Sequence, residues 1–401
     1  QAVDVLYHFM KEDKYKNIDY KHIFMTDGGT SNHNLNTYFT VCDFAELGYT
    51  GFSVIKNVEI KSIEDNDFLP YFILTDKAMM MFDPEFNNGV FIDDENIIKV
   101  YTGKFMSLYE KGEAFAQKYG ISKVYDNIDD VFYDPDVDII YISTPHNTHI
   151  NYLRKALSNG KHVLCEKSIT LNIAELDESV SLARENNVIL AEAMTIYHMP
   201  VYKKLNEIIA SGQLGRLNLI QVNFGSYKDY NMTNRFFSRK LAGGALLDIG
   251  VYSLSLIRWF FKETPTHVLS QVKYAPTGVD EQAGILLMND AAEMATVTLS
   301  LHSKQPKRAT LSFDKAYVEI FEYPRGMQAT ITYTEDGHKE VIDAGDTSDA
   351  LYYEVCDMEK AVSSASSDDV ENLMHCQYTY DVMKIMSDIR AEWGMKYPEE
   401  K

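Results

Sequence analysis

The fold is decided by a stretch that begins VDIIYISTPHNTH (137–149), continues NYLRKALSNG (151–160) and KHVLCEKSITLN (161–172), and ends NVILAEAM (187–194). Three short apolar runs, at 139–143, 162–165 and 188–191, alternate with two segments of helical period. Alternation of this kind is typical of parallel strands joined by crossover helices. The stretch therefore predicts an α/β fold with a doubly wound parallel sheet.

Polar side chains follow each of the three apolar runs. In doubly wound sheets, ligands bind in the crevice outside the carboxyl ends of the strands. One crevice is therefore expected to be lined by six residues: Thr144, Pro145, His146, Glu166, Lys167 and Glu192.

The pattern changes after Pro200, where runs of alternating polar and apolar residues replace the strand–helix repeat. The expected strands are 217–224, 267–274, 285–288, 295–302, 309–313, 317–321 and 327–334. They predict an α+β domain with a large open, mainly antiparallel sheet. The apolar segment 243–261 is expected to cover one face, which leaves the other for a second copy of the chain. A packed helix is predicted at 378–393.

Composition limits the class of partner. The chain has 401 residues, enough for two domains, and a formal net charge of −21 argues against nucleic acid or an anionic membrane as partner. Its four cysteines show no CxxC spacing, which indicates a reduced, cytoplasmic protein. No apolar run approaches the roughly 20 residues of a membrane span.

Four separated motifs carry a resemblance to a known family: STPHNTH (143–149), GKHVLCEKS (160–168), EAM (192–194) and AGGALLDIGVYSL (242–254). From about residue 105 onward the chain resembles the Gfo/Idh/MocA family of NAD(P)-dependent oxidoreductases, in particular its dihydrodiol and sugar dehydrogenases. The resemblance implies a Rossmann-type first domain and NAD or NADP as cofactor. It also implies hydride transfer between the nicotinamide and a hydroxyl carbon of a sugar, polyol or cyclic diol.

The resemblance places the catalytic pair at Lys167 and Tyr252, with Asp248 positioning the substrate. Oxidising an alcohol requires a group that takes the hydroxyl proton, and tyrosine does so at neutral pH only if a neighbouring cation favours its phenolate. Asp248 and Tyr252 are four residues apart, hence on one face of a helix. The alternative is that Tyr252 is a core aromatic residue and Asp248 a helix cap.

The resemblance also implies a cofactor site formed by nine residues: Ser143, Thr144, Pro145, His146, His149, Glu166, Lys167, Glu192 and Ala193. Asn234 and Arg235 either bind substrate hydroxyls or belong to a solvated loop. His146 and His149 lack a third ligand at metal-binding spacing, so no metal is predicted. The family has proline after the lysine, whereas this chain has Ser168.

Residues 1–104 depart from the family, because no G-x-G-x-x-G turn is present. The nearest substitute is DGGTSN, in which Gly28 and Gly29 could approach a phosphate, although a surface loop explains the same residues. The expected organisation is an atypical segment 1–104, the rest of the dinucleotide-binding domain at 105–198, and an α+β domain at 199–401. Without a working first βαβ unit, the alternative function is that of a non-catalytic binding or regulatory protein.

Overall fold

The computed structural model describes residues 116–125, 127–364 and 366–400, and the backbone of three strands between residues 71 and 92. The chain divides into two compact units, 1–131 and 132–401, and each is considered by itself. In the first unit β1 (Tyr71–Leu74), β2 (Met79–Phe82) and β3 (Gly89–Ile92) form an antiparallel sheet.

The second unit begins with the parallel sheet that the sequence predicts. Its strands β4 (Ile139–Ile142), β5 (His162–Glu166) and β6 (Leu190–Ala193) lie in the order β4-β5-β6. The last strand starts two residues later than predicted, because the turn that ends the preceding helix takes up those residues. There Asn187 has a φ of 54°, and the Val188 N–H donates to the Ala183 carbonyl at 2.9 Å.

Helices connect these strands as expected. Helix α3 (Ile128–Tyr133) precedes β4, a 3₁₀ turn η3 (His146–Thr148) leads into α4 (His149–Ser158), and α5 (Ile173–Glu185) joins β5 to β6. Helix α5 is capped at its N-terminus by two side chains. Asn172 Oδ1 accepts from the Glu175 N–H at 3.0 Å, and Glu175 Oε2 accepts from the Leu171 N–H at 2.9 Å.

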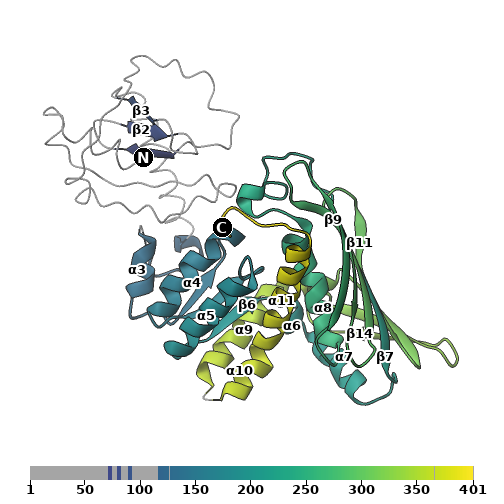
Figure 1. The fold of residues 1–401 in the computed structure, drawn as a ribbon. Helices are drawn as coiled ribbons and strands as arrows, with labels where there is room; N and C mark the ends of the chain where they lie inside the picture. The colour runs from purple at the N-terminus through teal and green to yellow at the C-terminus, as the bar shows by residue number, and fades with distance from the viewer. Residues whose placement is uncertain are drawn as a thin grey trace, which may run out of the picture. The chain divides into compact units, whose positions relative to one another are not determined.

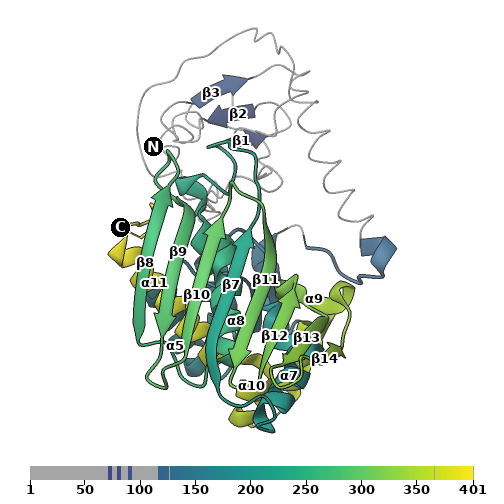
Figure 2. The same ribbon diagram turned by 90° about the vertical axis from the view of Figure 1, so that its right-hand side faces the viewer.

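Eight strands form the second sheet, which Figure 2 shows face-on. Their order is β14-β13-β12-β11-β7-β10-β9-β8, and all neighbours are antiparallel except the parallel pair β7 and β10. The strands are β7 (Leu217–Gly225), β8 (His267–Tyr274), β9 (Asp280–Met288), β10 (Met294–Ser300), β11 (Gln305–Phe313), β12 (Ala316–Phe321), β13 (Gln328–Tyr333) and β14 (Lys339–Asp343).

The predicted strands are all present, with changes at their ends. β9 begins five residues before the predicted 285, and β14 has no counterpart among the predictions. Both differences lie where charged residues interrupt the apolar alternation, Asp280 and Glu281 in β9 and Glu340 in β14. Asp280 and Glu281 are nevertheless buried, because each finds hydrogen-bond partners inside the domain.

A long apolar helical segment covers one face of this sheet (Figures 1 and 2). A 3₁₀ turn η4 (Arg239–Leu241) and a π-helical turn η5 (Leu246–Gly250) lead into α8 (Val251–Phe260), and α11 (Cys376–Glu392) packs beside α8. By length and composition alone, segment 239–260 could also cross a membrane, which the sequence analysis did not anticipate. Most of it is buried against the sheet and α11, as expected of a core helix.

The remaining elements lie between β6 and β7, between β12 and β13, and after β14. They are α6 (Thr195–His198), α7 (Pro200–Ala210), η6 (Tyr323–Arg325), η7 (Thr347–Asp349), α9 (Ala350–Ser363) and α10 (Ser367–Met374). The serine- and aspartate-rich segment 363–369 has the composition of a loop, but α10 begins inside it. Ser366 caps that helix by accepting from the Asp369 N–H at 3.4 Å.

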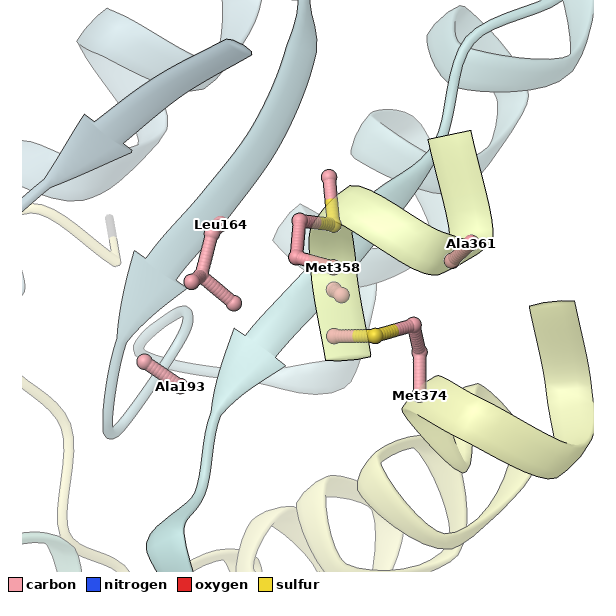
Figure 3. Packing of buried hydrophobic residues seen from close by; sticks show 6 residues of the cluster. Leu164, Ala193, Met358, Ala361 and Met374 are labelled. Atoms are coloured by element: carbon pink, nitrogen blue, oxygen red, sulfur yellow. The ribbon is translucent and has the colours of Figure 1, made fainter. Parts of the chain in front are cut away.

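Late helices complete the cover of the parallel sheet. Figure 3 shows Met358 of α9 and Met374 of α10 against Leu164 and Ala193 of the strands. Ala191 and Ala361 belong to the same cluster. Small side chains on β6 leave room for the two methionines, whose unbranched chains fill irregular gaps well.

We predict that Met358→Ala lowers the free energy of unfolding by about 2–5 kcal/mol, because it opens a cavity in this cluster. Met358 is 1% exposed. Tyr352→Ala on the same helix is the control, since Tyr352 is 65% exposed and its loss should cost much less. Urea unfolding of both variants measures the difference, and equal losses would contradict the packing described here.

Candidate functional site

Lys167 is the centre of the candidate site. It follows β5 directly, and its Nζ donates to the Asp248 carbonyl at 2.7 Å and to Asp248 Oδ1 at 3.3 Å. Lys167 and Asp248 side chains are each 13% exposed. The Lys167–Ser168 peptide bond is cis, and Ser168 Oγ donates to the Leu247 carbonyl at 2.9 Å. The end of the parallel sheet is thus joined directly to η5 of the second domain.

Lys167 and Asp248 are both charged at neutral pH. Burial opposes both charges, but for Lys167 the Asp248 carboxylate together with Tyr252 and Glu166 outweighs burial and raises the pKa of the ammonium. For Asp248, burial is likewise outweighed by Lys167, His146 and Arg235, so its pKa lies below the usual value. The site therefore holds a fixed ammonium at neutral pH.

Tyr252 lies beside this ammonium, as the sequence predicts. Lys167 Nζ is 4.9 Å from the centre of the Tyr252 ring, within the range of a cation–π contact. Burial raises the pKa of Tyr252 more than Lys167 lowers it. Lys167 lowers the pKa of Tyr252 as expected, but burial outweighs it, so the phenol stays protonated at neutral pH. Its hydroxyl makes no hydrogen bond to any residue described by the structure, so it is available to a ligand.

A buried aspartate that sequence reasoning missed holds the helix of Asp248 and Tyr252 in place. Asp280 Oδ2 accepts from the Leu246 N–H at 2.6 Å, at the start of η5. A Cβ on Gly244, whose φ is +132°, would lie 2.1 Å from Asp280 Oδ1. Burial raises the pKa of Asp280 to about 7. A lone aspartate at a strand start carries no sequence signal for this role.

The two histidines after β4 have different surroundings. The His149 ring is fully buried, with Nε2 2.6 Å from the Thr144 carbonyl and Nδ1 3.0 Å from that of Ser168. It ties together the loops that follow β4 and β5. His146 is half-buried, and desolvation followed by the Lys167 charge lowers its pKa to about 3. The described residues contain no group of three or more His, Cys, Asp or Glu suited to a metal.

Glu166 ends β5 at the mouth of the predicted crevice. Its Oε1 accepts from the Tyr141 hydroxyl at 2.6 Å and its Oε2 from the Lys167 N–H at 3.2 Å. Across the strand ends lie the exposed Ser143 and the half-buried Thr144 and Pro145, which lead into η3. Tyr141 is a further residue that sequence reasoning missed, because it reads as part of an apolar strand.

Glu192 and Ala193 end β6 and are both buried. Glu192 Oε1 accepts from the Ile169 N–H at 3.0 Å, and Oε2 accepts from Thr379 Oγ1 at 3.1 Å. Desolvation raises the pKa of Glu192 to about 7. The glutamate therefore fixes the loop after Lys167 against α11.

The loop before η4 carries the two predicted substrate residues. Asn234 Oδ1 accepts from the Phe236 N–H at 2.9 Å and its Nδ2 donates to the Asp229 carbonyl at 3.2 Å, so this amide shapes the loop. Arg235 points toward the site, with Nη2 4.0 Å from Asp248 Oδ1. Gly28 and Gly29 lie outside the described residues.

The structure brings together a dinucleotide-type parallel sheet, polar groups at its strand ends, and a lysine, aspartate and tyrosine supplied across two domains. That combination defines an oxidoreductase of the two-domain dinucleotide-binding class. A family profile described as "Oxidoreductase family, NAD-binding Rossmann fold" matches residues 95–194, and one described as "GFO/IDH/MocA C-terminal domain" matches residues 202–321. The chain belongs to the Gfo/Idh/MocA family of NAD(P)-dependent oxidoreductases, as its motifs predict.

Relatives include trans-1,2-dihydrobenzene-1,2-diol dehydrogenases. That of Xenopus laevis is 30% identical over 245 residues, or 61% of this chain and 73% of the relative. The mouse protein (Mus musculus) is 33% identical over 211 residues, or 52% of this chain and 63% of the relative.

Solved structures share the fold. A 3-ketoreductase from Actinomadura kijaniata, in complex with NADP and TDP-benzene, has a TM-score of 0.62 at 18% identity and covers 70% of this chain and 86% of its own. An NAD binding oxidoreductase from Klebsiella pneumoniae has a TM-score of 0.63 at 20% identity and covers 70% of this chain and 84% of its own.

We predict that Glu192→Gln stabilises the protein increasingly as pH rises. The pKa of Glu192 is raised to about 7, so its contribution is present below pH 4.5 and is lost as pH rises through 7. Glutamine imitates the protonated acid at every pH. At about 1.4 kcal/mol per pKa unit, the variant should gain roughly 2–3 kcal/mol on wild type between pH 5 and pH 8. Denaturant unfolding at both pH values measures this gain, and a constant difference would contradict it.

Proposed function

We propose that the protein transfers a hydride between NAD or NADP and a hydroxyl carbon of a sugar, polyol or cyclic diol. The observation that carries this proposal is the Lys167 ammonium, fixed by Asp248 and placed against Tyr252 at the end of β5. The names of the dihydrodiol dehydrogenases and the 3-ketoreductase support the choice of substrate class.

Lys167 is suited to bind the reacting oxygen. An ammonium has three N–H donors, and Asp248 engages two of them through its carbonyl and carboxylate oxygens. The third donor stabilises negative charge that develops on the substrate oxygen. Because Asp248 holds the ammonium in place, little reorganisation is needed during the reaction.

Tyr252 is suited to supply the proton. Its raised pKa keeps the phenol protonated at neutral pH, which is the form required to reduce a carbonyl compound. In the opposite direction, a substrate hydroxyl must give up its proton, so alcohol oxidation should accelerate as pH rises. Lys167 assists both directions, because its charge favours the phenolate.

The residues at the strand ends fit a dinucleotide. Glu166 offers a carboxylate to ribose hydroxyls, Ser143 and Thr144 offer hydroxyl groups, and the buried Asn147 Oδ1 has no hydrogen-bond partner among the described residues. When bound, the nicotinamide would supply or accept the hydride. The choice between NAD and NADP stays open, and the glycines proposed for the diphosphate, Gly28 and Gly29, precede the described region.

We predict that Tyr252→Phe lowers turnover by about 10²-fold or more, the usual worth of general acid–base catalysis, with cofactor affinity nearly unchanged. Lys167→Met should reduce turnover at least as much, and the double variant should lose less than the product of both effects. A screen of aldoses, inositols and cyclic diols with either cofactor identifies the substrate, and nicotinamide fluorescence measures cofactor binding.

Tyr133→Phe is the matched control, because Tyr133 is 70% exposed and lies outside the site. Wild-type turnover in Tyr252→Phe, under conditions where chemistry limits the rate, would show that another group carries the proton. Absence of cofactor binding at millimolar concentration would instead favour the non-catalytic alternative, a binding or regulatory protein with an altered first βαβ unit.

We also propose that the protein is a cytoplasmic homodimer or a dimer of dimers. Cys165, Cys356 and Cys376 are free thiols, which supports a reduced environment. The uncovered face of the eight-stranded sheet supports self-association, because large apolar side chains are exposed on it: Leu269, Leu286, Met294, Phe321 and Val341.

We predict that Leu286→Glu shifts the protein toward the monomer in light scattering at micromolar concentration, because a charge would be buried in the contact. Leu351→Glu is the control, since Leu351 has similar exposure but lies on α9. A wild-type monomer, or equal effects of the two substitutions, would refute this assembly.

A further inference from the structure

Two cations contact the same aromatic ring in the loop between β7 and η4. Lys228 Nζ lies 4.1 Å from the centre of the Phe236 ring, and Arg235 Cζ lies 4.5 Å from it. Both distances are well within the range of cation–π contacts. One ring therefore holds two like charges close together.

This pair borders the proposed catalytic residues. Arg235 Nη2 is 4.0 Å from Asp248 Oδ1, the same oxygen that lies 3.3 Å from Lys167 Nζ. Lys228 forms no ion pair with any carboxylate in the described part of the chain. Lys167 and Arg235 thus share one carboxylate, and Lys228 contacts the same ring as Arg235, in a chain whose formal net charge is −21.

Hydrogen bonds within this loop hold Lys228 and Arg235 in place around Phe236. Asn234 bonds the backbone on both sides of Arg235, and Asn231 Oδ1 accepts from the Thr233 N–H at 2.9 Å. Gathering like charges is unfavourable unless an anion completes the arrangement. Arginine with lysine is the pair that binds carboxylate and phosphate oxygens best.

We propose that the substrate carries an anionic oxygen group, a carboxylate or a phosphate, that is bound by Lys228 and Arg235 while its reacting oxygen meets Lys167 and Tyr252. This inference rests on the proposed function and narrows its substrate class. It makes the favoured compound an acidic sugar or polyol derivative rather than a neutral one.

The test compares glucose, glucuronate and glucose 6-phosphate, which differ in their charged group. Calorimetric titration into wild type should show tighter binding of at least one anionic compound, and the two anionic probes separate carboxylate from phosphate. Lys228→Met and Arg235→Met should each weaken that binding about ten-fold or more, as loss of a charge-assisted hydrogen bond does. Lys204→Met, which removes an exposed charge on α7, is the control.

Binding of anionic and neutral compounds with equal affinity would overturn the inference. So would an unchanged affinity ratio in Lys228→Met and Arg235→Met variants that keep the wild-type melting temperature. A loss of cofactor affinity without loss of substrate affinity would assign the cations to the cofactor. Because the titration needs no turnover, failure of the proposed reaction is seen separately, as normal anion binding without oxidation or reduction.

Discussion

The Lys167 ammonium is the constraint on which the rest of the site depends. An ammonium removed from water is costly unless a partner lies close, and here the partner comes from the other domain as the carbonyl and carboxylate of Asp248. The end of β5 and the start of α8 must therefore stay together. Ser168 Oγ, bonded to the Leu247 carbonyl, reinforces the same junction. These bonds hold the ends of the two elements together.

Local patterns in the sequence predict most of the architecture. The parallel strands, their crossover helices and the alternating strands are found near the expected positions, because each buries a regular apolar face. The patterns fail where tertiary contacts override local character. Asp280 and Glu281 are polar, yet they begin a buried strand. The serine- and aspartate-rich segment after α9 reads as a loop, although Ser366 caps a helix.

The candidate site, too, could be predicted from the sequence only in part. Lys167, Asp248 and Tyr252 could be placed together from motifs, since the family resemblance carries information about distant contacts. The protonation state of Tyr252 could not be predicted from motifs, because burial of its ring raises the pKa more than the nearby charge lowers it. Asp280 and Lys228 had no motif to mark them. Each acts through one contact, with the start of η5 or with Phe236, that only the folded chain creates.

The cover that α9, α10 and α11 give to the parallel sheet has a consequence for the order of folding. These helices lie about 180 residues after the strands they protect, and Cys376 Sγ reaches back to the Leu190 carbonyl at 3.5 Å. During synthesis, the apolar face around Leu164 and Ala191 stays open until α9 and α10 emerge from the ribosome. Such contacts between residues far apart in sequence slow folding, and they lengthen the time for which aggregation-prone apolar surface is exposed. The parallel sheet at 139–193 therefore completes its folding only with helices from the C-terminal part of the chain.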